Sequence, residues 1–127
     1  MSPSASTLDA PVGTDHDRLQ GAWEFVSGRR PAQLIVSGHH CVVKFKNGDI
    51  YVGFFELDPA YRPKRINVLI REGPERHQGK VSLGIYEFDG ELFRWAPNEP
   101  GMEERHATFP TEDDAHHLTL VFRRERS

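Results

Sequence analysis

Apolar and polar side chains alternate with a period of two along most of this chain, in short runs separated by Gly, Pro, Asn and Asp. Successive side chains of a β-strand point to opposite faces, so this alternation predicts half-buried strands. No long stretch shows the 3.6-residue apolar repeat of a helix. We expect strands near residues 20–27, 33–37, 40–46, 49–57, 65–72, 80–88, 91–96, 105–109 and 117–124.

This spacing of strands is typical of an all-β fold, either an antiparallel sandwich or a closed barrel. The chain has 127 residues, which is enough for one hydrophobic core and too few for two. We therefore expect a single antiparallel barrel of about eight strands. Residues 14–20 could add a short N-terminal helical turn, with Thr14 or Asp15 as its N-cap.

Asn47-Gly48 predicts a two-residue β-hairpin turn, because both residues accept the positive φ of a type I′ turn. Such a turn would place Phe45 opposite Ile50 and Val43 opposite Val52. Both faces of this hairpin carry apolar residues, and a bulge at Gly53 could exchange them midway. The interior face of the strand over 49–57 is therefore not decided by the pattern.

Asp89-Gly90 predicts a second hairpin of the same type. Its register would place Tyr86 opposite Phe93 and Gly84 opposite Trp95. The face that carries these rings is strongly aromatic, so we expect it to point into the barrel.

Charge and cysteine content exclude several classes of protein. The chain has 16 Lys and Arg against 19 Asp and Glu, a net charge of -3, so we expect neither a nucleic acid nor an anionic membrane as partner. The single cysteine, Cys41, excludes an internal disulfide and a multi-cysteine metal site.

The first residues are small and polar, with neither the basic start nor the apolar run of a signal peptide. We therefore expect residues 1–15 to form a disordered tail, residues 16–127 to form the barrel domain, and the protein to be cytoplasmic.

Histidines are the candidate metal or heme ligands. His39-His40 adjoins Cys41, but neighbouring strand residues point to opposite faces and would not share one ion. The same objection applies to His116-His117. His77 and His106 are candidate heme ligands, but neither lies in an apolar stretch. We expect no metal and no cofactor.

Two features resemble the lipocalin and calycin superfamily. Gly21-Ala22-Trp23 lies on the first expected strand, and the last strand ends in Arg123-Arg124. In that superfamily a basic side chain lies across the indole of the Gly-x-Trp motif and closes one end of the barrel. The resemblance implies that Arg124 packs on Trp23, a cation–π contact.

Longer segments resemble a narrower group, the lipocalin-like domain family described from planctomycete bacteria. The segments that carry this resemblance are 19–24, 51–59, 63–66, 84–90 and 93–97, with Pro100-Gly101 and Glu104-Arg105 after them. The resemblance covers about residues 17–125 and implies a lipocalin-like barrel. It implies no particular activity, because the family has none assigned.

These expectations favour a small intracellular protein that binds an apolar or amphipathic molecule inside the barrel. The candidate pocket residues are mostly aromatic: Trp23, Phe25, Tyr51, Phe55, Tyr86, Phe93 and Trp95. One alternative is a cofactor-independent cyclase or isomerase of natural-product biosynthesis, which would use Glu56, Tyr86 or Arg94. Another is an interaction module with a filled core. The sequence does not decide whether the chain forms a homo-oligomer.

Overall fold

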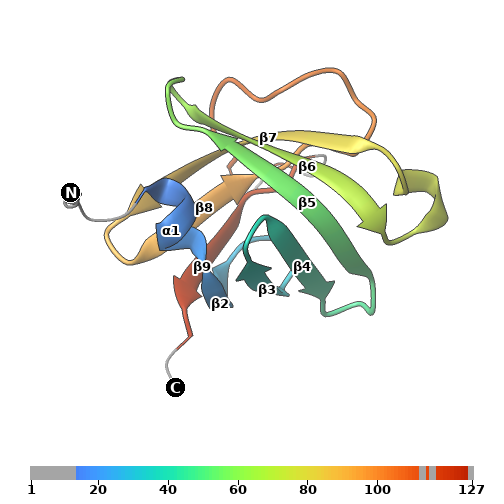
Figure 1. The fold of residues 1–127 in the computed structure, drawn as a ribbon, viewed down its shortest axis with the longest axis horizontal. Coiled ribbons are helices and arrows are strands. Elements are labelled where there is room, and N and C mark those ends of the chain that lie inside the picture. The colour runs from blue at the N-terminus through green and yellow to red at the C-terminus, as the bar shows by residue number, and fades with distance from the viewer. Residues whose placement is uncertain (1–13, 112–113, 115–116, 126–127) are drawn as a thin grey trace, which may run out of the picture.

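Eight antiparallel strands form a closed barrel (Figure 1), as the alternating sequence predicts. The computed structural model describes residues 14–111, 114 and 117–125. The described helices are α1 (Asp15–Leu19) and the 3-10 helix η1 (Glu75–His77). The strands are β2 (Gly21–Ser27), β3 (Ala32–Ser37), β4 (His40–Phe45), β5 (Ile50–Asp58), β6 (Lys64–Glu72), β7 (Val81–Asp89), β8 (Leu92–Ala96) and β9 (Leu120–Arg124).

The barrel closes where its first and last strands meet. Trp23 of β2 lies opposite Leu34 of β3 on one side and opposite Arg124 of β9 on the other. Every strand therefore has two hydrogen-bonded neighbours, which leaves the barrel without an exposed sheet edge. None of the helices among the described residues has the length and apolar content needed to cross a membrane.

The hairpin between β4 and β5 forms where it is expected, but its register differs from the prediction by one residue. The Phe45 N–H donates to the carbonyl of Asp49, 2.8 Å away, so the turn consists of Lys46-Asn47-Gly48. Gly48 has a φ of +108°, the positive value that a three-residue hairpin turn needs at this place. The prediction of a two-residue type I′ turn is wrong.

A shift by one residue exchanges the faces of one strand relative to the other. Val43 lies opposite Tyr51, and Cys41 lies opposite Gly53. Tyr51, Gly53 and Phe55 therefore point into the barrel together with Cys41 and Val43, while Ile50 is exposed.

The hairpin between β7 and β8 turns at Gly90-Glu91 and not at Asp89-Gly90. Its register places Tyr86 opposite Trp95 and Phe88 opposite Phe93, so the predicted pairs are wrong. The partner of each residue has moved by two positions, which preserves the face on which it lies. The aromatic face points inward as expected: Tyr86, Phe93 and Trp95 are all buried.

The strand expected over 105–109 does not form, and the strand expected from residue 117 begins only at Leu120. Because β8 pairs directly with β9, no strand edge is left for residues 105–109 to join. The chain after β8 instead follows β7 irregularly, with Asn98 N–H donating to Leu83 O and Gly101 N–H donating to Val81 O.

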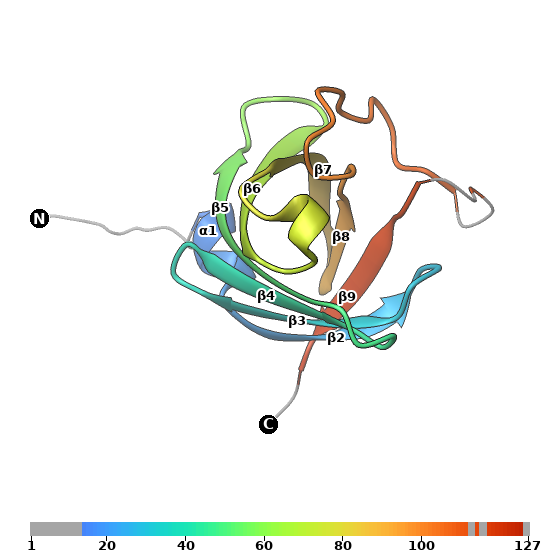
Figure 2. The same cartoon turned by 90° about the vertical axis from the view of Figure 1, so that its right-hand side faces the viewer.

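Helix α1 covers one end of the barrel, and η1 lies at the other end, which faces the viewer in Figure 2. The Thr14 hydroxyl caps α1 by accepting from the Asp17 N–H. The tail is expected over residues 1–15. Of these, residues 1–13 lie outside the described residues, and Thr14 and Asp15 are described. Thr14 is the N-cap of α1 and Asp15 its first residue, as the expected helical turn over 14–20 has them.

Trp23 joins α1 to the barrel. The indole is 2% exposed, and its N–H donates to the Leu19 carbonyl at 2.8 Å. The guanidinium carbon of Arg124 lies 4.5 Å from the centre of the Trp23 ring, and Arg124 also donates to the carbonyl of Gln20. One ring thus holds the helix on one side and the last strand on the other.

Asp15 forms a second link between α1 and the strands. Its carboxylate accepts from the Tyr86 hydroxyl at 2.8 Å and from Lys64 Nζ at 2.9 Å. Burial opposes ionisation of Asp15, but these two hydrogen bonds and the nearby positive charges outweigh it. The pKa of Asp15 is therefore lower than its ordinary value of 3.8.

Tyr86→Phe removes one of these hydrogen bonds, and we expect it to reduce the free energy of unfolding by about 1–2 kcal/mol at pH 7. Because the folded pKa of Asp15 is lowered, this stabilisation is complete above the unfolded pKa of about 4 and is lost as the pH falls through the folded value. Denaturant titrations at pH 7 and below pH 3 measure the difference. Tyr61→Phe, at an exposed ring, is the control. An equal loss at both pH values would contradict the account.

Candidate functional site

A cavity of about 380 Å³ occupies the end of the barrel near η1. This volume lies in the range of small-molecule sites in proteins. Its walls are inward-facing residues of six strands and of the segment just before β9: Cys41, Val43, Phe45, Tyr51, Gly53, Val68, Ile70, Ser82, Trp95, Leu118 and Leu120. Figure 2 looks into the barrel from this end, where η1 lies over the opening.

The barrel is filled at one end and hollow at the other because the inward side chains differ in size. At the α1 end the rings of Trp23, Tyr86, Phe88 and Phe93 contact one another, and Phe55 belongs to the same core. Toward η1, many inward positions carry small side chains, namely Cys41, Val43, Gly53, Val68 and Ser82, beside the larger Phe45, Tyr51 and Ile70. The small side chains leave the middle of this half unfilled.

Trp95 forms the boundary between the two halves. It lines both the cavity and a small void of about 10 Å³ on the filled side. Its side chain is 6% exposed, and its indole nitrogen has no hydrogen-bond partner among the described residues. A buried N–H without a partner is costly. This nitrogen lies beside Gly84 and has almost no accessible surface, so it is the ring of Trp95 that borders the cavity.

Tyr51 and His77 bring a polar pair to the cavity wall. The Tyr51 hydroxyl is hydrogen-bonded to His77 Nδ1 at 2.8 Å. Burial raises the pKa of Tyr51, whereas burial and the charge of Arg76 lower the pKa of His77. Both groups are therefore neutral near pH 7, and the pair can exchange hydrogen bonds with a ligand without adding a charge to the wall.

The mouth of the cavity is positively charged. Arg29, Arg30 and Arg76 line it, against the single carboxylate of Glu99 among the described lining residues. Arg30 already has two partners. Its guanidinium carbon lies 4.1 Å from the centre of the Phe45 ring, and its Nη2 lies 3.6 Å from Oδ2 of Asp49.

Of the residues expected to line a pocket, only Tyr51 and Trp95 border this cavity. Trp23, Phe55, Tyr86 and Phe93 belong to the filled half. Phe25 packs edge-on against Phe122 and does not border the cavity.

The polar candidates for catalysis lie elsewhere. Glu56 is exposed on the outer face of β5. Arg94 lies on the outer face of β8, where it forms an ion pair with Glu87 directly opposite. The Tyr86 hydroxyl is engaged by Asp15 at the α1 end. None of the three reaches the cavity.

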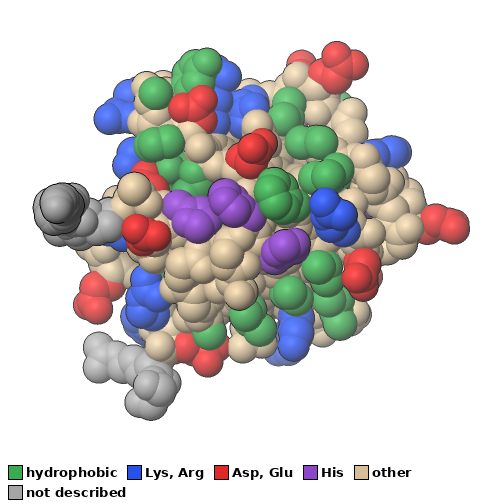
Figure 3. Space-filling view, in the orientation of Figure 1, with side chains coloured by type: hydrophobic (Ala, Val, Ile, Leu, Met, Phe, Trp, Pro, Cys, Tyr) green, Lys and Arg blue, Asp and Glu red, His purple; other side chains and the backbone are tan. Residues whose placement is uncertain are grey.

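Histidine side chains gather on the surface beside α1 (Figure 3). The rings of His16 and His39 lie 4.5 Å apart, and both His39 and His40 contact the Phe54 ring. His39 belongs to the turn before β4, and His40 is the first residue of that strand. Among the described residues, no group of side chains is arranged to hold a metal ion.

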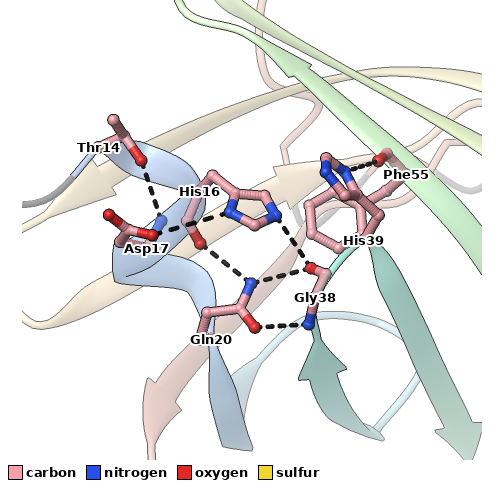
Figure 4. A network of polar contacts seen from close by, with 7 residues as sticks. All are labelled: Thr14, His16, Asp17, Gln20, Gly38, His39 and Phe55. Atoms are coloured by element: carbon pink, nitrogen blue, oxygen red, sulfur yellow. Dashed lines mark hydrogen bonds and ion pairs between the residues drawn. The ribbon is translucent and has the colours of Figure 1, made fainter.

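The same region fastens α1 to the turn between β3 and β4 (Figure 4). The Gln20 amide makes two hydrogen bonds to the backbone of Gly38, and His16 Nε2 donates to the Gly38 carbonyl at 3.0 Å. His39 donates to the carbonyl of Phe55. These contacts hold the closed end of the barrel together. They give His16 and His39 a structural role that needs no bound ligand.

Two cavity residues are not among those expected to line a pocket: Ser82, and His77, which the sequence suggests only as a candidate heme ligand. His77 lies in a polar stretch, and only the turn at η1 buries it, to 8% exposure. Ser82 faces inward on β7, two positions before Gly84 on the same face as Tyr86. The alternation could have identified Ser82, but nothing local indicates His77.

Comparison of the chain with protein families, with curated proteins and with solved structures finds no match in any of the three.

Cys41 lies at the floor of the cavity, and burial raises the pKa of its thiol to about 12. The thiolate is the reactive form, so we expect a disulfide reagent at pH 8 to label the native protein at least about a hundredfold more slowly than the unfolded chain. Absorbance of the released thiol reports the rate. Labelling of the native protein as fast as in denaturant would mean that Cys41 is accessible and that the packing described is wrong.

Proposed function

We propose that this protein is a lipocalin-like barrel that binds a small apolar or amphipathic molecule in the cavity near η1. The observation that carries the proposal is the hollow half of an otherwise filled barrel, a cavity of about 380 Å³ with largely apolar strand residues as its walls. A preformed apolar cavity with a few polar groups is the usual form of a small-molecule site.

The polar groups support the same function. The neutral Tyr51–His77 pair and the Ser82 side chain lie in the wall. Such groups fix the orientation of a ligand whose binding energy comes from apolar contact. A filled interaction module would have no use for them.

The resemblance to lipocalins is part of this proposal. The Gly-x-Trp motif at Gly21–Trp23 lies on the first strand of the barrel, and Arg124 packs on the indole from the last strand. This arrangement supports membership of the lipocalin-like group.

Catalysis by the residues expected from the sequence has less support, because Glu56, Tyr86 and Arg94 do not border the cavity. Two other groups at the cavity can exchange protons: the hydrogen-bonded Tyr51–His77 pair and His117, which is hydrogen-bonded to Asp114. An isomerase or cyclase could use either.

The uncharged fluorophore phenylnaphthylamine tests the proposal. Apolar contact with the cavity walls favours its binding, and the lost freedom of the probe offsets part of that gain. We expect its emission to rise on binding and the tryptophan emission to fall by energy transfer from Trp95.

Val43→Phe places a ring in the cavity, and we expect it to weaken binding at least about tenfold. The empty space accommodates the ring, so the stability should change by no more than about 1–2 kcal/mol. Val42→Phe makes the same change on the outer face of β4 and should bind like the wild type. Failure of the wild type to bind, or equal binding by Val43→Phe, would contradict the proposed function.

A further inference from the structure

The mouth of the cavity carries more positive charge than a purely apolar ligand requires. Arg29, Arg30 and Arg76 line it against Glu99, in a chain whose net charge is -3. Among the described residues, Arg29 and Arg76 have no carboxylate within ion-pairing distance. The protein as a whole is acidic, so this local excess of cations distinguishes the mouth from the rest of the surface.

The position of the arginines relative to the apolar walls indicates how a ligand would lie. Arg29 and Arg76 are both exposed, so a charged group beside them keeps much of its hydration. The walls farther in, formed by Val43, Val68 and Ile70, provide no compensation for a buried charge. An anion is therefore stabilised at the mouth and destabilised inside.

We propose that the ligand of this cavity is an amphipathic anion, with its acidic group at the mouth beside Arg29 and Arg76 and its apolar body extending to Trp95. The inference rests on the proposed function and adds the chemical class and orientation of the ligand. A carboxylate, sulfonate or phosphate group on an apolar body has this chemistry, and guanidinium groups bind all three.

The Trp95 N–H is the competing position for the acidic group, because it is a buried donor without a partner. One neutral donor stabilises an anion far less than two guanidinium groups do, and the floor excludes water. The nitrogen also has almost no accessible surface, which leaves it out of reach of a group in the cavity.

Two probes that differ in one group test the inference: anilinonaphthalene sulfonate and its uncharged parent, phenylnaphthylamine. We expect the wild type to bind the sulfonate more tightly than the uncharged probe. Added salt should weaken binding of the sulfonate and leave binding of the uncharged probe unchanged. Arg29→Gln combined with Arg76→Gln should weaken sulfonate binding about tenfold and leave the uncharged probe unchanged. Retained binding of the uncharged probe shows that the variant is folded.

Arg71→Gln combined with Arg123→Gln is the matched control, since it removes the same charge from exposed residues that do not border the cavity. We expect it to bind both probes like the wild type. Equal weakening by the two double variants would mean a general charge effect and would overturn the inference. If Trp95→Phe weakens sulfonate binding and the mouth variants have no effect, the anion lies at the floor. That result would also overturn the inference.

The two proposals fail differently. Binding of the uncharged probe with no preference for the sulfonate would overturn the anion and leave the proposed function standing. If neither probe binds, the proposed function fails and the inference fails with it. Should the mouth variant not fold, the salt dependence of the wild type decides: equal dependence for both probes would overturn the inference.

Discussion

The contacts of one indole ring, Trp23, hold together the parts of this protein that come from opposite ends of the chain. Its N–H donates to the carbonyl of Leu19, which holds α1 over the barrel end, and its face carries the guanidinium of Arg124 from the last strand. Its other neighbours are Phe88 and Phe93. Closure of the barrel and coverage of its α1 end therefore depend on the same side chain.

This concentration of large rings has a consequence at the opposite end. A small eight-stranded barrel has an interior that side chains can just fill, and here the volume of aromatic side chains is placed almost entirely on the α1 side. Beyond Trp95 many inward positions are small or β-branched, among them Cys41, Val43, Gly53 and Ser82, and the space between them and Tyr51 remains empty. A cavity lowers the free energy of unfolding, because the side chains around it lack packing contacts. The packing of the filled half offsets this cost, so the other half can stay open.

The sequence predicted the barrel, its helical turn and most of its strands, because alternation and turn residues are local signals. It failed on the register of both hairpins, since Gly48 and Gly90 each serve turns that start or end one residue away from the predicted ones. The odd shift in the first hairpin reversed the relation between its faces, whereas the two-position shift in the second kept Tyr86 and Trp95 inside.

The candidate site was harder to predict for a different reason. An aromatic residue on an inward face can fill the core or line a cavity, and the choice depends on the size of the residues across the barrel. Phe55 and Tyr51 lie on the same face of β5, yet Phe55 is packed in the core and Tyr51 borders the cavity. His77 enters the site through a turn that no local pattern indicates.

The barrel has one filled and one hollow half, with Trp23 inside the filled half and Trp95 at the floor of the hollow one. Fluorine NMR of protein labelled with fluorotryptophan measures this directly, with Trp95→Phe to assign the two resonances. On addition of phenylnaphthylamine, the account predicts a shift of the Trp95 resonance and none for Trp23, which is buried at the opposite end. A shift of Trp23 with Trp95 unmoved, or no shift of either resonance at saturating probe, would contradict it.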